Sequence, residues 1–178
     1  MKSYRPYVFG FSLLMLATIS LAQSKPRSGE DRSGIASELV GSWRLISIEE
    51  KHANGEAVDP PQWARNPVGI LIYDAKGNMA VQIMNSGRVK FRSESSDKVT
   101  VEEKAAAYDG YLAYFGTYEI NEKEGFIIHH LKGHSSPNPV GTDFKRDFEY
   151  LGDRLILSLA PTVRGEKRIR RLTWERVK

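Results

Sequence analysis

Short apolar segments alternate with turn signals along the chain from residue 39 onward. The segments with the length and alternation of β-strands are 39–50, 68–74, 79–84, 114–120, 126–132, 142–150, 154–159 and 168–177. Eight strands in up-and-down order form an antiparallel meander that can close into a barrel, which removes exposed sheet edges and leaves room for one small ligand. We therefore predict an all-β fold, a barrel of about eight strands, with Trp174 of the last strand packed near the first.

One helix interrupts the strand pattern. Thr100-Val101-Glu102-Glu103 is a capping box, in which the Thr100 hydroxyl accepts from the Glu103 amide and the Glu103 carboxylate reaches back. The apolar residues that then recur at helical spacing are Val101, Ala105, Tyr108 and Leu112. The fold is therefore expected to contain one helix, which begins after Thr100.

The N-terminus has the pattern of an export signal. Lys2 and Arg5 precede a mostly apolar stretch at 8–21, and Ser20-Leu21-Ala22 fits the small-x-small cleavage pattern. A membrane anchor is the alternative, but the stretch is shorter than the roughly 20 apolar residues that span a bilayer and contains polar residues. We predict a signal peptide at 1–22, a periplasmic or secreted mature protein beginning at Gln23, and no membrane span after cleavage.

Composition narrows the classes of partner. Residues 23–37 are polar and rich in Ser, Gly and charge, which predicts a disordered leader, and 38–178 is long enough for one domain. Without the signal peptide, 24 basic residues stand against 22 acidic residues. This net charge of +2 is too small to indicate nucleic-acid binding. The absence of cysteine excludes disulfides, thiolate metal sites and a cysteine nucleophile.

The strand at 142–150 carries the clearest candidate for ligand binding. Its charged face consists of Asp143, Lys145, Asp147 and Glu149, and its other face consists of Phe144, Arg146, Phe148 and Tyr150. Arg146 is thus the one cation in an aromatic row that is expected to face inward, and an unpaired buried charge is costly. Arg146 either anchors a carboxylate or other oxygen-rich head group, or is a structural residue paired with an internal acid or stacked on a ring.

Other residues are candidates for the wall of a cavity. Gln82 shares a strand face with Ala80 and Met84, and either contacts a ligand carbonyl or faces solvent. Aromatic area for the core or the wall is supplied by Tyr73, Tyr111, Phe115 and Tyr118.

Three histidines lie close together in the sequence. His129 and His130 point to opposite faces of a strand, and His130 and His134 are roughly 13 Å apart along an extended chain, so they are not expected to share a metal or haem. We interpret His130 as a buried residue, hydrogen-bonded in or beside the cavity.

The chain carries no recognised catalytic motif. It lacks Gly-x-Ser-x-Gly, a phosphate-binding loop and His-Glu-x-x-His, so no catalytic residue is assigned. Two alternatives to a binding protein stay open. One is a barrel enzyme that isomerises or cyclises a small apolar substrate, with His130 or Tyr118 moving a proton. The other is a filled barrel that acts through its surface, with the loop at 51–67 and an exposed Trp63 as the contact.

The chain resembles the lipocalin-like domain proteins of bacteria and fungi from Leu39 to its C-terminus. The stretches that carry the resemblance include Leu39-Val40-Gly41-Ser42-Trp43-Arg44-Leu45, the aromatic segment 106–118, His129-His130, Pro139-Val140-Gly141-Thr142, Arg146 and Leu172-Thr173-Trp174-Glu175-Arg176. The resemblance implies a calycin-type barrel and, by analogy, binding of a small molecule. It implies neither a particular ligand nor a catalytic set.

These observations predict an exported, lipocalin-like protein that binds a small hydrophobic or amphipathic ligand, acidic ones included, in the barrel cavity. No cofactor or metal is predicted, and the oligomeric state is left open. The predicted ligand-binding residues are Tyr73, Gln82, Tyr111, Phe115, Tyr118, His130, Phe144, Arg146 and Phe148.

Overall fold

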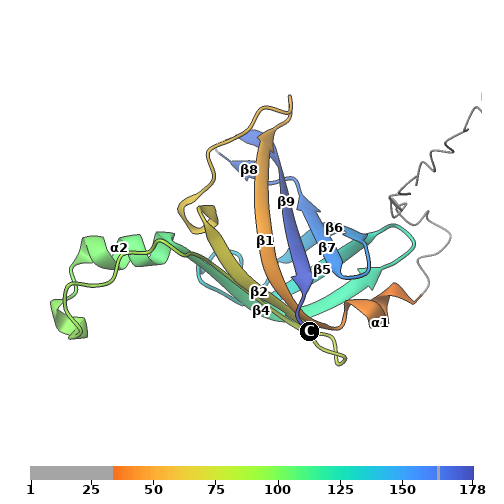
Figure 1. The fold of residues 1–178 in the computed structure, drawn as a ribbon, viewed down its shortest axis with the longest axis horizontal. Coiled ribbons are helices and arrows are strands. Elements are labelled where there is room, and N and C mark those ends of the chain that lie inside the picture. Colours follow the sequence, from red (N-terminus) through yellow and green to blue (C-terminus); the bar gives the residue numbers. More distant parts are fainter. Residues whose placement is uncertain (1–33, 164) are drawn as a thin grey trace, which may run out of the picture.

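Eight antiparallel strands close into a barrel. The computed structural model describes residues 34–163 and 165–178, so the predicted signal peptide lies outside the described residues. The barrel strands are β1 (Gly41–His52), β2 (Pro67–Tyr73), β3 (Asn78–Asn85), β4 (Tyr111–Asn121), β5 (Phe126–His134), β6 (Asp143–Tyr150), β7 (Arg154–Leu159) and β9 (Glu166–Arg176). Each strand pairs with the next in this order, and β9 pairs back with β1 (Figure 1). The short β8 (Thr162–Val163) pairs with β9 alone. The predicted all-β barrel is confirmed.

A short helix, α1 (Ile35–Leu39), covers one end of the barrel, which we call the floor (Figure 1). Its buried residues are Ile35 and Leu39, and the indole Nε1 of Trp43 donates to the Leu39 carbonyl at 3.0 Å. The Arg176 guanidinium stacks 4.3 Å from the Trp43 ring. The helix therefore begins inside the segment predicted as a disordered leader, where Ile35 packs into the core together with Leu39, which follows that segment.

A bulge in β1 decides which of its residues face inward. The pairing of β1 with β9 shifts between Leu45 and Ser47, so Ile46 is an extra residue that faces outward. One extra residue exchanges the two faces of a strand. As a result, Glu50 points into the barrel.

A second bulge lies in β5. The pairing of β4 with β5 shifts between Phe115 and Gly116, and Lys132 is the extra residue. A Cβ atom at Gly116 would lie 1.9 Å from the His130 carbonyl oxygen, so no side chain fits at this position. The shift turns His134 inward.

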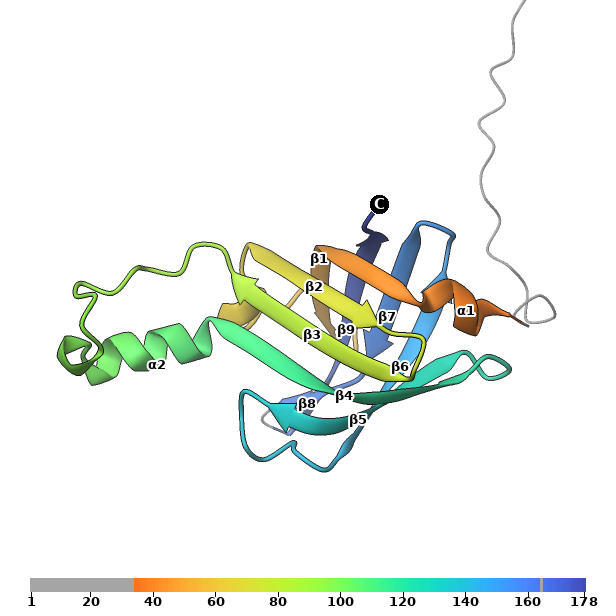
Figure 2. The same cartoon turned by 90° about the horizontal axis from the view of Figure 1, so that it is seen from below.

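Residues 86–110, which we call the arm, extend away from the barrel (Figure 1, Figure 2). The arm contains the 3-10 helix η3 (Ser96–Lys98) and the helix α2 (Val101–Asp109), none of whose residues is buried. The predicted capping box is present: the Glu103 amide donates to Thr100 Oγ1 at 3.2 Å, and the Thr100 amide donates to Glu103 Oε2 at 2.9 Å. In the described ranges, no helix combines the length and the hydropathy that crossing a bilayer requires.

Candidate ligand-binding cavity

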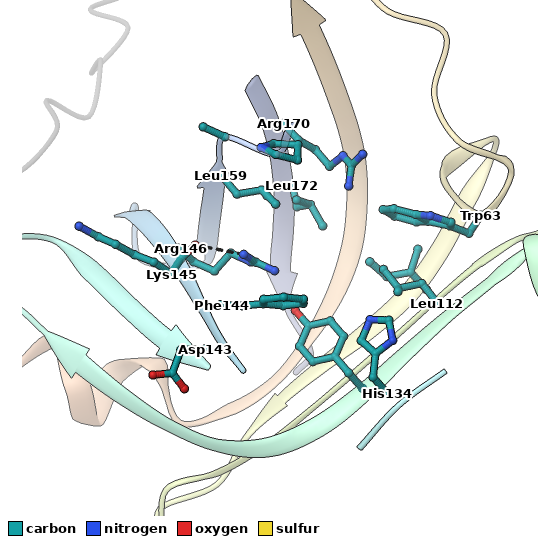
Figure 3. A pocket seen from close by; sticks show the side chains of 14 residues that line it. Trp63, Leu112, His134, Asp143, Phe144, Lys145, Arg146, Leu159, Arg170 and Leu172 are labelled. Carbon is teal, nitrogen blue, oxygen red and sulfur yellow. Dashed lines mark hydrogen bonds between the residues drawn. The ribbon is translucent and has the colours of Figure 1, made fainter. Parts of the chain in front are cut away.

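A cavity of about 370 Å³ occupies the part of the barrel interior away from the floor. One side is covered by Trp63, which lies in the 3-10 helix η2 (Gln62–Ala64). The apolar and aromatic residues that line the cavity are Trp63, Ile83, Leu112, Tyr114, Phe144, Leu159 and Leu172 (Figure 3). Small-molecule sites in proteins measure about 300–1,000 Å³ and are mostly apolar, with a few polar groups that orient the ligand. The cavity fits this description at the small end.

Arg146 is a nearly buried charged residue on the cavity wall. It is 9 % exposed, stacks 4.7 Å from the Phe144 ring centre, and donates through Nη1 to the Lys145 carbonyl at 3.0 Å. Figure 3 shows its side chain pointing toward the cavity, whereas Lys145 and Asp143 point away. Among the residues that the structure describes, no carboxylate forms an ion pair with Arg146. Of the structural alternatives, stacking on a ring is therefore present, and an internal acid is not found in this part of the chain.

A buried ion cluster lies beside the cavity. The Glu50 carboxylate is fully buried and accepts from Arg170 Nε at 2.6 Å and from Arg168 Nη1 at 3.2 Å. The Arg170 guanidinium also stacks 5.0 Å from the Trp63 ring and lines the cavity. Arg168 also pairs with Glu166, whose Oε2 lies 3.6 Å from Arg168 Nε, so two carboxylates face the two guanidinium groups. The unbalanced positive charge at the cavity is therefore that of Arg146.

Behind the cavity wall, His129 joins two tyrosines. Its Nε2 lies 2.7 Å from the Tyr73 hydroxyl, and its Nδ1 lies 3.3 Å from the Tyr114 hydroxyl. Burial, followed by the nearby charge of Arg146, lowers the pKa of His129 to about 3, so the imidazole is neutral at neutral pH. Burial also raises the pKa of Tyr73 well above its ordinary value. Tyr114 belongs both to this network and to the cavity lining.

Five of the predicted ligand-binding residues face the barrel interior. Phe144 and Arg146 line the cavity itself. Phe148 and Tyr73 are buried in the core. Tyr118 packs on Tyr73 near the floor, with ring centres 4.5 Å apart, and donates to the carbonyl of Asp74 in the β2–β3 turn. The structure therefore brings only two of the predicted residues together in the cavity.

The other four predicted residues lie on the outside of the barrel. Gln82 is exposed and accepts from the Tyr111 hydroxyl at 3.0 Å, and Phe115 is 57 % exposed. His130 is partly exposed, with Nδ1 2.6 Å from an Asp143 carboxylate oxygen. The expected burial of His130 is wrong, and the expected place of these residues in the cavity wall is wrong too. Both faces of β5 are largely apolar, so the alternation of its residues does not show which histidine points inward.

Sequence reasoning missed several residues of the cavity. Trp63 was expected to be exposed on a loop, but it is half-buried and packs against the core. His134 lines the cavity and stacks on Tyr114, with ring centres 5.8 Å apart, because the β5 bulge reverses the alternation. Glycines inside two strands, at Gly116 and Gly133, were the available signal, since a glycine within a strand often marks a bulge.

Within the described ranges, no three acidic or imidazole side chains converge on a site that could hold a metal ion. What the interior offers instead is an apolar space with cationic and hydroxyl groups on its wall. The arrangement can hold a small molecule that has an apolar body and an oxygen-rich end.

A closed eight-stranded antiparallel barrel with a covered floor and a lined cavity is the architecture of lipocalin-type binding proteins. The family model described as a lipocalin-like domain matches residues 40–177, and the chain belongs to this family. A curated relative is the 4'-hydroxy-3'-methoxypropiophenone carrier protein ppsC of Aspergillus oryzae. It is 29 % identical over 107 residues, which cover 56 % of this chain and 96 % of the relative. The family and this relative support a ligand-binding barrel.

Proposed function

We propose that this protein is an exported carrier of a small amphipathic molecule whose acidic oxygen group pairs with Arg146. The single observation that carries this proposal is the nearly buried guanidinium on an apolar cavity wall, without a carboxylate partner among the described residues.

The energetics of a buried charge support an anionic ligand. Taking a guanidinium out of water is costly unless a partner charge and hydrogen bonds compensate. Glu50 does not supply that partner, because it already binds Arg168 and Arg170. A ligand carboxylate would accept two parallel hydrogen bonds from the planar guanidinium, and its apolar body would contact Phe144 and Trp63.

The named relative supports a ligand with an aromatic body. 4'-Hydroxy-3'-methoxypropiophenone is a small aromatic ketone with a phenolic hydroxyl group. Aromatic side chains at Trp63, Tyr114 and Phe144 line the cavity of this protein, and such rings pack well on a flat aromatic ligand. An aryl or alkyl acid of this size is the ligand class that we favour.

A matched pair of probes tests the proposal. We expect 4-phenylbutyrate to bind the mature protein more tightly than 4-phenylbutan-1-ol, which has the same carbon skeleton and no charge. Hydrogen bonds to a charged group contribute about 1.5–3 kcal/mol, which corresponds to roughly a 10- to 100-fold preference. Isothermal titration calorimetry measures both affinities.

The variant Arg146→Met is expected to remove the preference for the acid and to leave binding of the alcohol largely unchanged. Arg171→Met is the matched control, because Arg171 lies on the outer face of β9 and pairs with Glu149 on the surface. Equal affinity for acid and alcohol in the wild type, or a preference that survives in Arg146→Met, would overturn the proposal.

Export is proposed from the pattern at residues 1–22. The test is expression of the full chain in a Gram-negative host, followed by cell fractionation and N-terminal sequencing. We expect the protein in the periplasm or medium, with Gln23 as its first residue. Uncleaved protein in the cytoplasmic fraction would contradict this part of the proposal.

A further inference from the structure

The hydrogen bonds that connect Tyr73, His129 and Tyr114 behind the cavity can run in either of two directions. A neutral imidazole has one N–H donor and one bare nitrogen acceptor. His129 is 0 % exposed, and each of its ring nitrogens meets one tyrosine hydroxyl. Two arrangements are therefore possible: the protons point either from Tyr73 toward Tyr114, or from Tyr114 toward Tyr73.

The surroundings of the two hydroxyl groups differ. Tyr73 is 1 % exposed, and His129 is its one hydrogen-bond partner among the described residues. If His129 donated to Tyr73, the Tyr73 proton would be buried without an acceptor, and such an unmet donor costs about 1–3 kcal/mol. Tyr114 instead lines the cavity, where a ligand or water can accept its proton. The favoured direction therefore runs from Tyr73 through His129 to Tyr114.

We propose that this relay, from Tyr73 through His129, fixes Tyr114 as a hydrogen-bond donor to the ligand. The cavity then recognises a carboxylate through two groups, the Arg146 guanidinium and the Tyr114 hydroxyl. Both groups pack on the same Phe144 ring, with Arg146 at 4.7 Å and the Tyr114 ring centre at 5.8 Å. This inference rests on the proposed function for the identity of the ligand, whereas the direction of the relay can be tested without one.

The direction predicts a single tautomer of His129, with the proton on Nδ1 and a bare Nε2. Two-bond ¹H–¹⁵N correlation spectra of the ¹⁵N-labelled, ligand-free protein distinguish the two tautomers, and His129→Gln assigns the signals. A His129 ring protonated on Nε2 would overturn the inference.

Binding measurements test the donor itself. Tyr114→Phe, which keeps the ring and removes the hydroxyl group, is expected to weaken 4-phenylbutyrate roughly tenfold. Tyr108→Phe, on the exposed arm, is the control and should bind as the wild type does. If Tyr114→Phe binds 4-phenylbutyrate as tightly as the wild type does, while Arg146→Met still loses the preference for the acid, this inference fails and the proposed function stands. If the wild type does not prefer the acid, the proposed function fails, and the tautomer still decides the direction of the relay.

Discussion

Arg146 is the residue on which the proposed function depends, and its burial is expected to lower the stability of the ligand-free protein. Its guanidinium is nearly buried, stacks on Phe144 and has no acid partner among the described residues. Natural binding sites often retain groups that are unfavourable in the free protein because a ligand satisfies them. In this protein the ligand-free barrel carries the desolvation cost of that charge.

The first prediction is therefore that Arg146→Met folds at least as stably as the wild type. Methionine keeps the contact with Phe144 and removes a charge that burial disfavours, so the free energy of unfolding should stay unchanged or rise by up to about 2 kcal/mol. Urea unfolding followed by tryptophan fluorescence measures it. A loss of more than about 2 kcal/mol would show that Arg146 is a structural residue.

The second prediction concerns His129 and acid. Its pKa is lowered from the ordinary 6.5 to about 3 in the folded protein, chiefly by burial. Between pH 6.5 and pH 3, His129 therefore binds a proton in the unfolded chain and stays neutral in the folded chain. The free energy of unfolding should fall between pH 6.5 and pH 3, by at most about 1.4 kcal/mol per pH unit from this residue.

His129→Gln should have a shallower loss of stability over the same range, because it lacks this proton uptake. His130→Gln, which changes the neighbouring imidazole on the outer face, is the control and should keep most of the loss. The measurement is the free energy of unfolding of the wild type and both variants at pH 7, 5 and 4. Parallel curves for the wild type and His129→Gln would contradict the prediction.

For single residues, the sequence predicted that Arg146 faces inward, and it did not show which of the histidines does. Apart from Arg146 itself, its strand alternates between charged and aromatic residues, so the pattern showed which face points inward. The strand of His129 and His130 is apolar on both faces, and alternation cannot rank two faces that are equally apolar. Only the packing of the closed barrel distinguishes the two.

At the scale of elements, the strands were predicted within a few residues, and the bulges were missed. Alternation assumes a constant period of two, and each extra residue, Ile46 in β1 and Lys132 in β5, reverses it. The inward positions of Glu50 and His134 follow from these reversals. The capping box of α2 was predictable because it depends on four consecutive residues.

The third prediction follows from the β1 bulge. Glu50→Gln should lower the free energy of unfolding by about 3–5 kcal/mol, because it leaves the Arg170 charge without its buried partner and leaves Arg168 with Glu166 alone. Chemical denaturation measures the loss. Glu175→Gln is the control: Glu175 pairs with Arg44 near the surface, so its loss should cost at most about 1 kcal/mol. Equal effects of the two substitutions would contradict this account of the buried cluster.

For the whole molecule, closure of the barrel was predictable and the position of the cavity was not. The expected contact of Trp174 with the first strand is confirmed, since it pairs with Leu45. The cavity depends on Trp63, which comes from a long loop whose path no local pattern determines. The arm also differs from expectation, because the apolar face predicted for its helix is exposed at Val101 and Tyr108.

A crystal structure of the protein saturated with 4-phenylbutyrate would show directly whether the barrel binds an acid through Arg146 inside the cavity. We expect the carboxylate to lie within hydrogen-bond distance of the Arg146 guanidinium and the phenyl ring to pack against Phe144 and Trp63. A carboxylate bound elsewhere on the protein, or an empty cavity at saturating ligand, would contradict this expectation.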